Sequence, residues 1–250
     1  MIFEFKKGAD ERSRFLFGTF WRDDACRELS VLEPKDVVLA VDKAYIDMTP
    51  RTITGLGLSE DKIKSGTKKS QEYKALIVLK LNVIQKLKGT LAENIVEKVF
   101  KAGSFDDNIH HMLCEDFIKD FQKKIDVLNA QIRVVKNIDE NIREIIKEKI
   151  TYGKAQKIVN MSMKYLYFFD DAITYKKTVF ENCHMAVDEY IMKYFDKYGG
   201  KRGKRNVSNW SNFNEQTYVD YQKAVKTYCD AQKKNRFFAE FEYWNEGRKL

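Results

Sequence analysis

Proline is almost missing from this chain of 250 residues, which contains only Pro34 and Pro50. Proline ends or kinks an α-helix, because it lacks a backbone N–H and clashes with the preceding turn. The residues after Pro50 can therefore form long helices without forced kinks. Long apolar runs are missing too: none approaches the roughly 18 residues that a membrane-spanning helix needs. We therefore expect no interaction with a membrane.

Cysteine is scarce and scattered along the chain. The four cysteines are Cys26, Cys114, Cys183 and Cys229, and no two of them form a C-x-x-C pair. This spacing excludes a dense disulfide framework and predicts reduced, mostly buried thiols in a reducing compartment. The N-terminal residues are followed by charged residues rather than by the apolar run of a signal peptide. We expect a cytoplasmic protein.

The common motifs of catalysis and cofactor binding are absent from the sequence. It has no P-loop, no dinucleotide-binding fingerprint and no nucleophile elbow, so no particular cofactor is predicted. Histidine occurs only three times. His110 and Cys114 have the i, i+4 spacing of two zinc ligands, but no second pair accompanies them. We predict no metal site.

Apolar residues recur at the 3.6-residue helical period through most of the chain. Residues 71–87 show this pattern, and Gly89 is expected to end their helix. A long helix is also expected from Asn214, followed by an aromatic tail. The pattern predicts an all-α, multi-helix bundle with an irregular, aromatic-rich N-terminal arm over residues 1–30.

We expect the chain to divide at about residue 136. Residues 1–136 are expected to hold the N-terminal arm and a helical region, and residues 137–250 a C-terminal helical bundle. The two parts can also form one continuous domain.

A row of polar residues interrupts one strongly apolar helix pattern. From Ala155 to Phe169 the expected helix is apolar through most of its circumference, and Gln156, Asn160 and Lys164 fall four residues apart on its only polar strip. Such a row can hold a ligand, with the lysine binding a phosphate or carboxylate. Exposure to solvent also explains it adequately.

His184 and Asp188 form a second polar pair. The pattern from Val179 to Phe195 predicts one helix, on which these two residues lie beside apolar positions and away from the solvent face. A buried aspartate needs a partner, and a histidine four residues earlier can supply it. The pair can act as a general base with its orienting carboxylate, or as a structural pair that bridges two helices.

Positive charge is concentrated in one glycine-containing loop. Lys201, Arg202, Lys204 and Arg205 can contact phosphates, and Trp210 nearby can stack on a base. The chain as a whole has a formal net charge of +8. These features predict nucleic acid or a nucleotide as a partner, although a solvated loop with a core tryptophan is the alternative.

The pattern Y-G-K-A-Q-K-x-x-N-M-x-x-K-Y-L at Tyr152 to Leu166, followed by C-H-x-x-x-D at Cys183 to Asp188, resembles one found in bacterial and phage all-helical proteins. The resemblance implies a bacterial or phage origin and carries no activity with it.

Three functional hypotheses follow from the sequence. The first is a binding protein for a phosphate-rich ligand, which uses the basic loop and the polar row. The second is an enzyme in which His184 is the general base and Asp188 its orienter, with Lys164, Asn160 and Gln156 holding the substrate. The third is a helical module that binds a protein partner and whose polar residues only specify packing.

Overall fold

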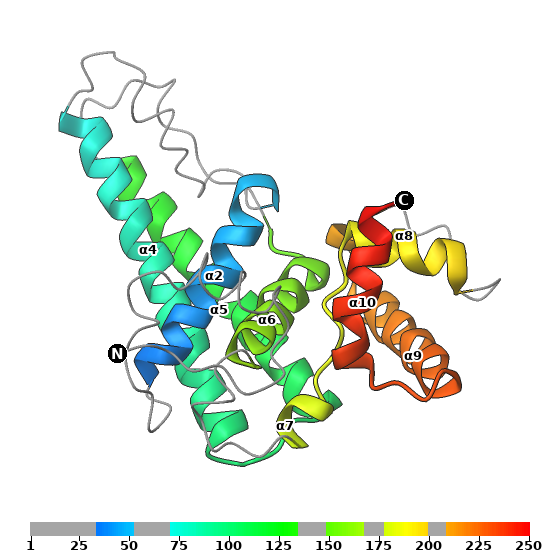
Figure 1. Cartoon of the computed structure of the whole chain (residues 1–250). Coiled ribbons are helices and arrows are strands. Elements are labelled where there is room, and N and C mark those ends of the chain that lie inside the picture. The colour runs from blue at the N-terminus through cyan, green and yellow to red at the C-terminus, as the bar shows by residue number, and fades with distance from the viewer. Residues whose placement is uncertain (1–33, 53–70, 135–148, 168–177, 200–208) are drawn as a thin grey trace, which may run out of the picture.

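The computed structural model describes residues 34–52, 71–134, 149–167, 178–199 and 209–250. Every regular element within these ranges is helical (Figure 1), which confirms the all-α prediction. The predicted N-terminal arm lies outside the described residues. None of the described helices combines the length and the hydropathy that crossing a bilayer requires.

The described residues contain eight α-helices and two short helical turns. They are α2 (Pro34–Thr52), α4 (Gln71–Ile95) with a π-helical turn after it (Val96–Phe100), α5 (Asp107–Val134), α6 (Tyr152–Tyr167), α7 (Thr178–Glu181), α8 (Glu189–Tyr198), a 3-10 turn (Trp210–Asn212), α9 (Glu215–Ala231) and α10 (Arg236–Arg248).

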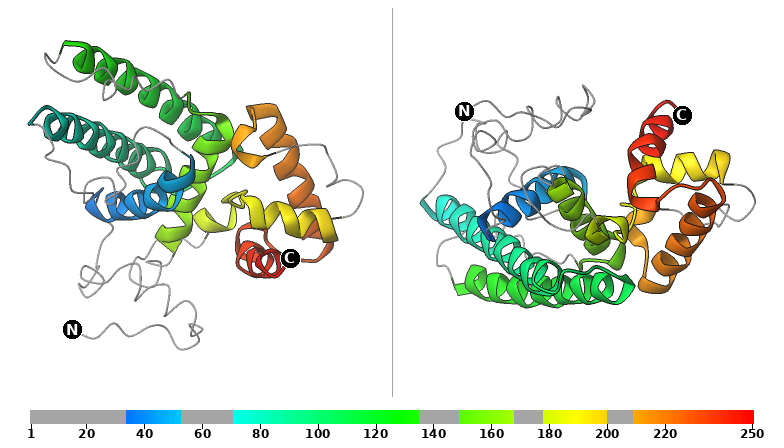
Figure 2. Two further views of the ribbon diagram at one scale, coloured as in Figure 1. Left: turned by 90° about the horizontal axis from the view of Figure 1, so that it is seen from above. Right: turned by 60° about the horizontal axis from the view of Figure 1, so that its bottom comes forward.

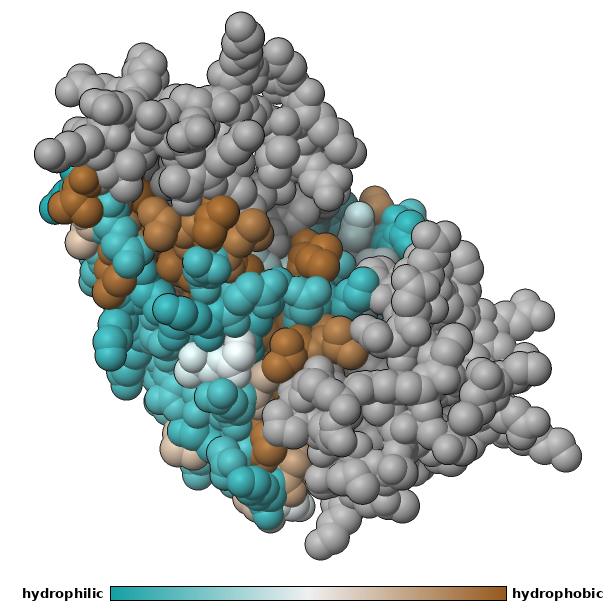
Figure 3. Space-filling model, turned by 90° about the vertical axis from the view of Figure 1, so that its left-hand side faces the viewer, coloured by the Kyte–Doolittle hydropathy of each residue, from teal (hydrophilic) through white to brown (hydrophobic). Residues whose placement is uncertain are grey.

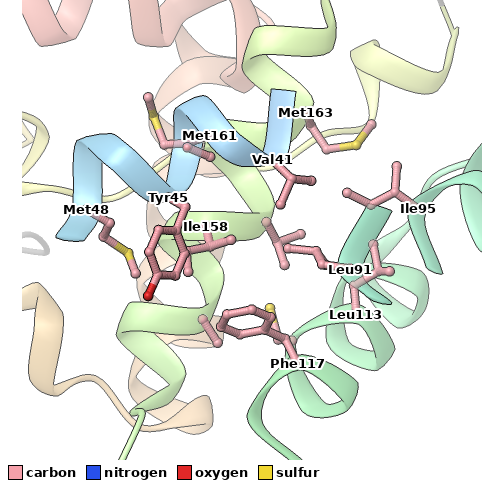
Figure 4. Close-up of a cluster of buried hydrophobic side chains, with 14 of the residues drawn as sticks. Val41, Tyr45, Met48, Leu91, Ile95, Leu113, Phe117, Ile158, Met161 and Met163 are labelled. Atoms are coloured by element: carbon pink, nitrogen blue, oxygen red, sulfur yellow. The ribbon is translucent and has the colours of Figure 1, made fainter. Parts of the chain in front are cut away.

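The long helices α4 and α5 lie side by side, and α2 and α6 pack against them (Figures 1 and 2). Apolar side chains from all four helices meet in one core, in which Val41, Leu91, Leu113 and Ile158 are buried (Figure 4). Burial of each such side chain contributes roughly 1.5–3 kcal/mol. This core makes α6 the central helix, as its apolar circumference predicts.

Gly89 does not end its helix, so that prediction is wrong. Helix α4 continues to Ile95, and the Thr90 hydroxyl donates to the Lys86 carbonyl at 2.9 Å, a bond within one helical turn. Leu91 and Ile95 extend the buried stripe beyond the glycine. Their burial outweighs the cost of about 1 kcal/mol for a glycine inside a helix.

The last part of the chain forms two helices where the sequence predicts one helix and an aromatic tail. Asn214 caps α9 by accepting from the Thr217 N–H at 2.8 Å. Asn235 caps α10 by accepting from the Phe237 N–H at 2.9 Å. The predicted tail is therefore helix α10, because a second asparagine cap restarts the helix after a tight turn.

Helices α8, α9 and α10 share a second, smaller core (Figure 1). In it the rings of Tyr194 and Tyr243 stack with their centroids 4.2 Å apart. The main core, however, also includes Tyr218 of α9 and Phe237 of α10. The predicted division at residue 136 stays a prediction.

Two glycines give a matched test of this packing. A Cβ added at Gly153 would lie 2.0 Å from the Trp210 carbonyl oxygen, whereas one added at Gly89 meets nothing within 4 Å. We expect Gly153→Ala to lower the free energy of unfolding by about 1–3 kcal/mol. Gly89→Ala is expected to raise it by about 0.5–1 kcal/mol. Urea denaturation followed by circular dichroism measures both, and equal effects would contradict the close contact at Gly153.

Candidate functional site

The polar strip of α6 faces the protein interior. Gln156 and Asn160 are fully buried, and Lys157 and Lys164 are largely buried. The explanation of this strip by exposure to solvent is therefore wrong. The strip instead faces residues 182–188, which we call the interior segment.

The interior segment is not helical, so the prediction of one helix from Val179 to Phe195 is wrong. Helix α7 ends at Glu181, and α8 begins only at Glu189. Asp188 is the cap of α8: its Oδ1 accepts from the N–H groups of Tyr190 and Ile191, each at 3.0 Å. A carboxylate at this position favours a new helix start over continuation of the previous helix.

Side chains from three helices bind the backbone of the interior segment. Gln156 of α6 donates to the Val187 carbonyl at 3.2 Å, and Gln222 of α9 donates to the Met185 carbonyl at 2.7 Å. Glu240 of α10 accepts from the Ala186 N–H at 2.7 Å. Buried backbone groups need such partners. These side chains replace the hydrogen bonds that a helix or a sheet would provide.

Arg236 and Asn160 complete these bonds. The Arg236 Nε donates to the Cys183 carbonyl at 3.2 Å, and the Asn160 Nδ2 lies 3.4 Å from the Met185 carbonyl. Asn160 also donates to the Gln156 Oε1 at 2.9 Å. Two residues of the predicted ligand-binding row therefore hold the chain itself.

Two largely buried ion pairs flank the interior segment. Lys164 Nζ lies 2.6 Å from Glu240 Oε1, and Lys157 Nζ lies 2.7 Å from Asp188 Oδ2. The Trp244 indole also donates to Asp188 Oδ2 at 2.9 Å. Burial alone would raise the pKa of Asp188, but the Lys157 charge and the donors around it hold that pKa below its ordinary value. Asp188 is therefore ionised, and both of its carboxylate oxygens accept hydrogen bonds within the protein.

His184 pairs with Asp107 rather than with Asp188, so the predicted pair does not form. Its Nε2 lies 2.7 Å from Asp107 Oδ1, and its Nδ1 lies 2.8 Å from the Tyr218 hydroxyl. Asp107 belongs to the first turn of α5 and also accepts from Arg236 at 3.0 Å. The helix break at Asp188 explains the change of partner, because the two residues no longer share a helix face.

His110 lies flat against His184, with ring centroids 4.0 Å apart and an interplanar angle of 17°. Its Nε2 lies 3.2 Å from the Tyr218 hydroxyl, to which Asn160 donates at 2.9 Å. We call Asp107, His110, Asn160, His184 and Tyr218 the imidazole cluster. It connects α5, α6, α9 and the interior segment.

Hydrogen-bond accounting assigns the protons of the imidazole cluster. An ionised carboxylate only accepts, so His184 carries its proton on Nε2 and its Nδ1 accepts from Tyr218. The Tyr218 oxygen then accepts from His110 Nε2–H and from Asn160. These bonds can all form with both imidazoles neutral, while the Asn160 Oδ1 is buried without a hydrogen-bond partner among the described residues.

Burial keeps the rings of this cluster uncharged. It lowers the pKa of His184 to about 4 and the pKa of His110 well below its ordinary value. The hydrogen bond from His184, together with Arg236, holds the pKa of Asp107 well below its ordinary value, against a smaller opposite effect of burial. The cluster at neutral pH therefore contains one carboxylate and two neutral imidazoles.

The geometry limits what the imidazole cluster can do chemically. A general base needs a ring nitrogen that reaches the substrate, but both nitrogens of His184 are engaged inside the fold. Of the cluster, only Asp107 reaches far into solvent, with 79% of its side chain exposed. The structure thus places His184 as a link between elements, and its predicted catalytic role stays a prediction.

The zinc-like spacing of His110 and Cys114 does not extend into a ligand set. The Cys114 Sγ lies 3.7 and 3.8 Å from the two ring nitrogens of His110, and burial raises the pKa of this thiol. Within the described ranges, no three histidine, cysteine or carboxylate side chains converge as metal ligands would.

Of the predicted phosphate-binding residues, only Trp210 is described. Lys201, Arg202, Lys204 and Arg205 lie outside the described residues. Trp210 is half-buried in the 3-10 turn, and the Lys157 ammonium lies 5.8 Å from its ring centroid. Its ring is therefore partly used by contacts within the protein.

Sequence reasoning missed Asp107, Tyr218 and Glu240, and it also missed Gln222 and Arg236, which bind the interior segment. Glu240 carried a usable signal, because it lies three residues from both Phe237 and Tyr243 on the apolar face of its helix. Asp107 and Tyr218 carried none, since a helix-starting aspartate and a helical tyrosine are ordinary.

Comparison of the chain with protein-family models, with curated proteins and with solved structures gives no match.

The importance of the ion pairs can be measured with two glutamates on α10. Glu240 is buried with Lys164, whereas Glu242 forms an exposed pair with Lys234 at 2.6 Å. Removing one member of a buried pair costs about 3–5 kcal/mol, and an exposed pair contributes roughly 0–1 kcal/mol. We expect Glu240→Ala to lower the free energy of unfolding by about 3 kcal/mol and Glu242→Ala to change it by less than about 1 kcal/mol. Similar losses would show that Glu240 does not hold the interior segment.

Proposed function

We propose that the protein binds a phosphate-rich ligand, either nucleic acid or a nucleotide, on the surface around residues 197–210. Charge in the sequence supports this proposal. From Lys197 to Asn214 the chain contains five cationic residues and no acidic one, between Asp196 and Glu215. Such a stretch attracts phosphate with little opposing charge nearby.

Both ends of this cationic stretch are attached to ordered elements. At its start, the Gly199 N–H donates to the Phe195 carbonyl at 2.8 Å and ends α8. Near its end, the Phe213 carbonyl accepts from the Gly153 N–H of α6 at 2.9 Å. The proposed contacts of Lys201, Arg202, Lys204 and Arg205 would therefore occur between two fixed supports.

Tyr198 offers the accessible aromatic ring at this surface. It is 44% exposed, and Lys197 Nζ lies 5.0 Å from its ring centroid. Trp210 is less accessible, because it is half-buried in the 3-10 turn. Base stacking on an exposed ring, combined with nearby cations, is typical of proteins that bind single-stranded nucleic acid.

In this proposal the interior row is a scaffold. The amide of Gln156 contacts the interior segment, and the ammonium of Lys164 contacts Glu240. We propose that these residues fix the shape of the molecule while the ligand binds outside. The predicted direct contact of Gln156, Asn160 and Lys164 with a ligand has no such support.

We also propose a reducing, cytoplasmic location in a bacterial or phage system. Cys114, Cys183 and Cys229 are buried free thiols, which fits a reducing compartment. The bacterial or phage origin rests on the resemblance of the Tyr152–Leu166 and Cys183–Asp188 patterns.

A protein-interaction role is the second candidate, and exposed apolar side chains support it. Figure 3 shows hydrophobic side chains gathered on the side of the molecule where α4 lies. The exposed large apolar residues of α4 and α5, among those described, are Val78, Leu81, Met112, Val127 and Val134. Light scattering on the purified protein tests self-association. A monomer at all concentrations, unchanged in Leu81→Lys, would count against a second copy as the partner.

The basic stretch is tested by changing Lys201, Arg202, Lys204 and Arg205 together to alanine. We expect the affinity for labelled single-stranded DNA to fall more than about tenfold, and the slope of log K against log salt to decrease by about 3. Fluorescence anisotropy at several salt concentrations measures both quantities.

A matched control removes the same amount of charge elsewhere. Lys119, Lys123, Lys223 and Lys226 are exposed on α5 and α9, and their joint change to alanine is expected to leave most of the affinity. Equal losses in the two variants, or no salt-dependent binding by the unchanged protein, would refute the proposed surface.

Stacking is tested at Tyr198. Base–aromatic stacking contributes about 1–3 kcal/mol per base, so Tyr198→Ala is expected to weaken binding of single-stranded DNA at least about fivefold. Tyr198→Phe keeps the ring and is expected to retain the affinity. If both variants bind like the unchanged protein, the ring does not contact the ligand.

A further inference from the structure

The stacked imidazoles are buried titratable groups that the proposed binding surface does not use. His110 is 1% and His184 4% exposed. The edge of Phe105 contacts both rings, at centroid distances of 6.1 and 6.4 Å. Both imidazoles share the hydroxyl of Tyr218. The stack therefore holds the interior segment, through His184, against α5 and α9.

The charges around the two rings leave no room for another positive charge. The charged groups that act on them are Asp107 of α5 and Arg236 of α10, and these two already bind each other at 3.0 Å. The facing side chains of α6 and α9, Asn160 and Tyr218, are uncharged. A proton on either ring therefore adds a second cation to a site with one anion.

More distant acidic groups do not compensate such a charge. Glu240 of α10 is paired with Lys164. Glu215 of α9 lies 3.1 Å from His111, which is outside the stack. Besides burial, the negative charge of Glu115 raises the pKa of Cys114 and of Tyr152. Cys114 itself is neutral, because burial raises its pKa.

We propose that the His110–His184 stack is an acid-sensitive latch: protonation of either ring separates the two imidazoles and releases His184 from Asp107 of α5 and Tyr218 of α9, which favours opening of the interior segment.

The direction of the pH effect follows from the protonation states. In the closed form burial lowers the pKa of His184 to about 4, and in an opened segment the ordinary value of about 6.5 returns. The open form binds more protons between these values, so opening becomes more favourable as the pH falls from about 6.5 to 4. The Asn160 amide favours protonated His110, but burial and the charge of Arg236 outweigh it.

The size of the effect follows from the same values. At about pH 5 an ordinary imidazole is protonated about 30-fold more often than not, whereas the closed-form His184 is mostly neutral. We therefore expect the opening equilibrium of the interior segment to rise about 20-fold between about pH 7 and pH 5 for His184 alone, because the open form is already partly protonated at pH 7.

Hydrogen exchange followed by mass spectrometry tests the latch on the whole chain. Exchange in a peptide that covers residues 182–188, corrected for the intrinsic effect of pH, is expected to increase about 20-fold or more between about pH 7 and pH 5. A peptide around Phe121–Leu128 of α5, in the main core, serves as the internal reference and is expected to change little. Equal changes in the two peptides, or none in either, would overturn the proposal.

Three single variants identify the groups responsible. His110→Phe keeps a stacking ring, and His184→Gln keeps a donor for Asp107; each is expected to remove at least about tenfold of the pH effect. His111→Gln is the matched control, because His111 is a partly exposed neighbour outside the stack, and it is expected to keep the full effect. Comparing each variant with itself at two pH values removes differences in overall stability. Full pH dependence in both stack variants would overturn the latch.

The unchanged protein gives an independent answer if a stack variant does not fold. Proton NMR follows the ring protons of all three histidines during an acid titration. Two of them are expected to keep the neutral-ring position until the peptide at 182–188 opens. Titration of every histidine before that opening would also overturn the proposal.

Discussion

The structure depends on satisfying the backbone of one buried, non-helical segment. A backbone group that is buried without a partner costs about as much as a lost hydrogen bond, and residues 183–187 are buried between α7 and α8. Gln156, Gln222 and Glu240 supply partners from three different helices. The placement of α9 and α10 beside α6 follows from this requirement.

Two kinds of polar contact meet at this segment, and they respond differently to their surroundings. The pairs Lys164–Glu240 and Lys157–Asp188 keep charges of both signs inside the fold. The imidazole cluster instead keeps its rings neutral, because burial disfavours a charge that has no additional anion to face. The first kind gives fixed attachment, whereas the second can be released by a proton.

The sequence predicted the helical class and the central position of α6, because apolar periodicity reports burial directly. It also located the polar residues that matter, Gln156, Asn160, His184 and Asp188. Their partners were not predictable. A helix pattern continues through Cys183–Val187, and only the capping bonds of Asp188 show that the helix breaks there. Asp107 lies 77 positions from His184 in the sequence, and local patterns carry no information at that range.

The side chains that hold the interior segment have a consequence for the order of folding. Arg236 and Glu240 belong to α10, which follows the segment by about fifty residues. During synthesis, the middle of the protein therefore waits for its partners from α9 and α10, while α2, α4, α5 and α6 can already assemble their own apolar contacts. Late, long-range closure of this kind slows folding, because the connecting chain must be ordered before its contacts form. Formation of the contacts around the interior segment thus couples the folding of α2, α4, α5 and α6 to the folding of α9 and α10.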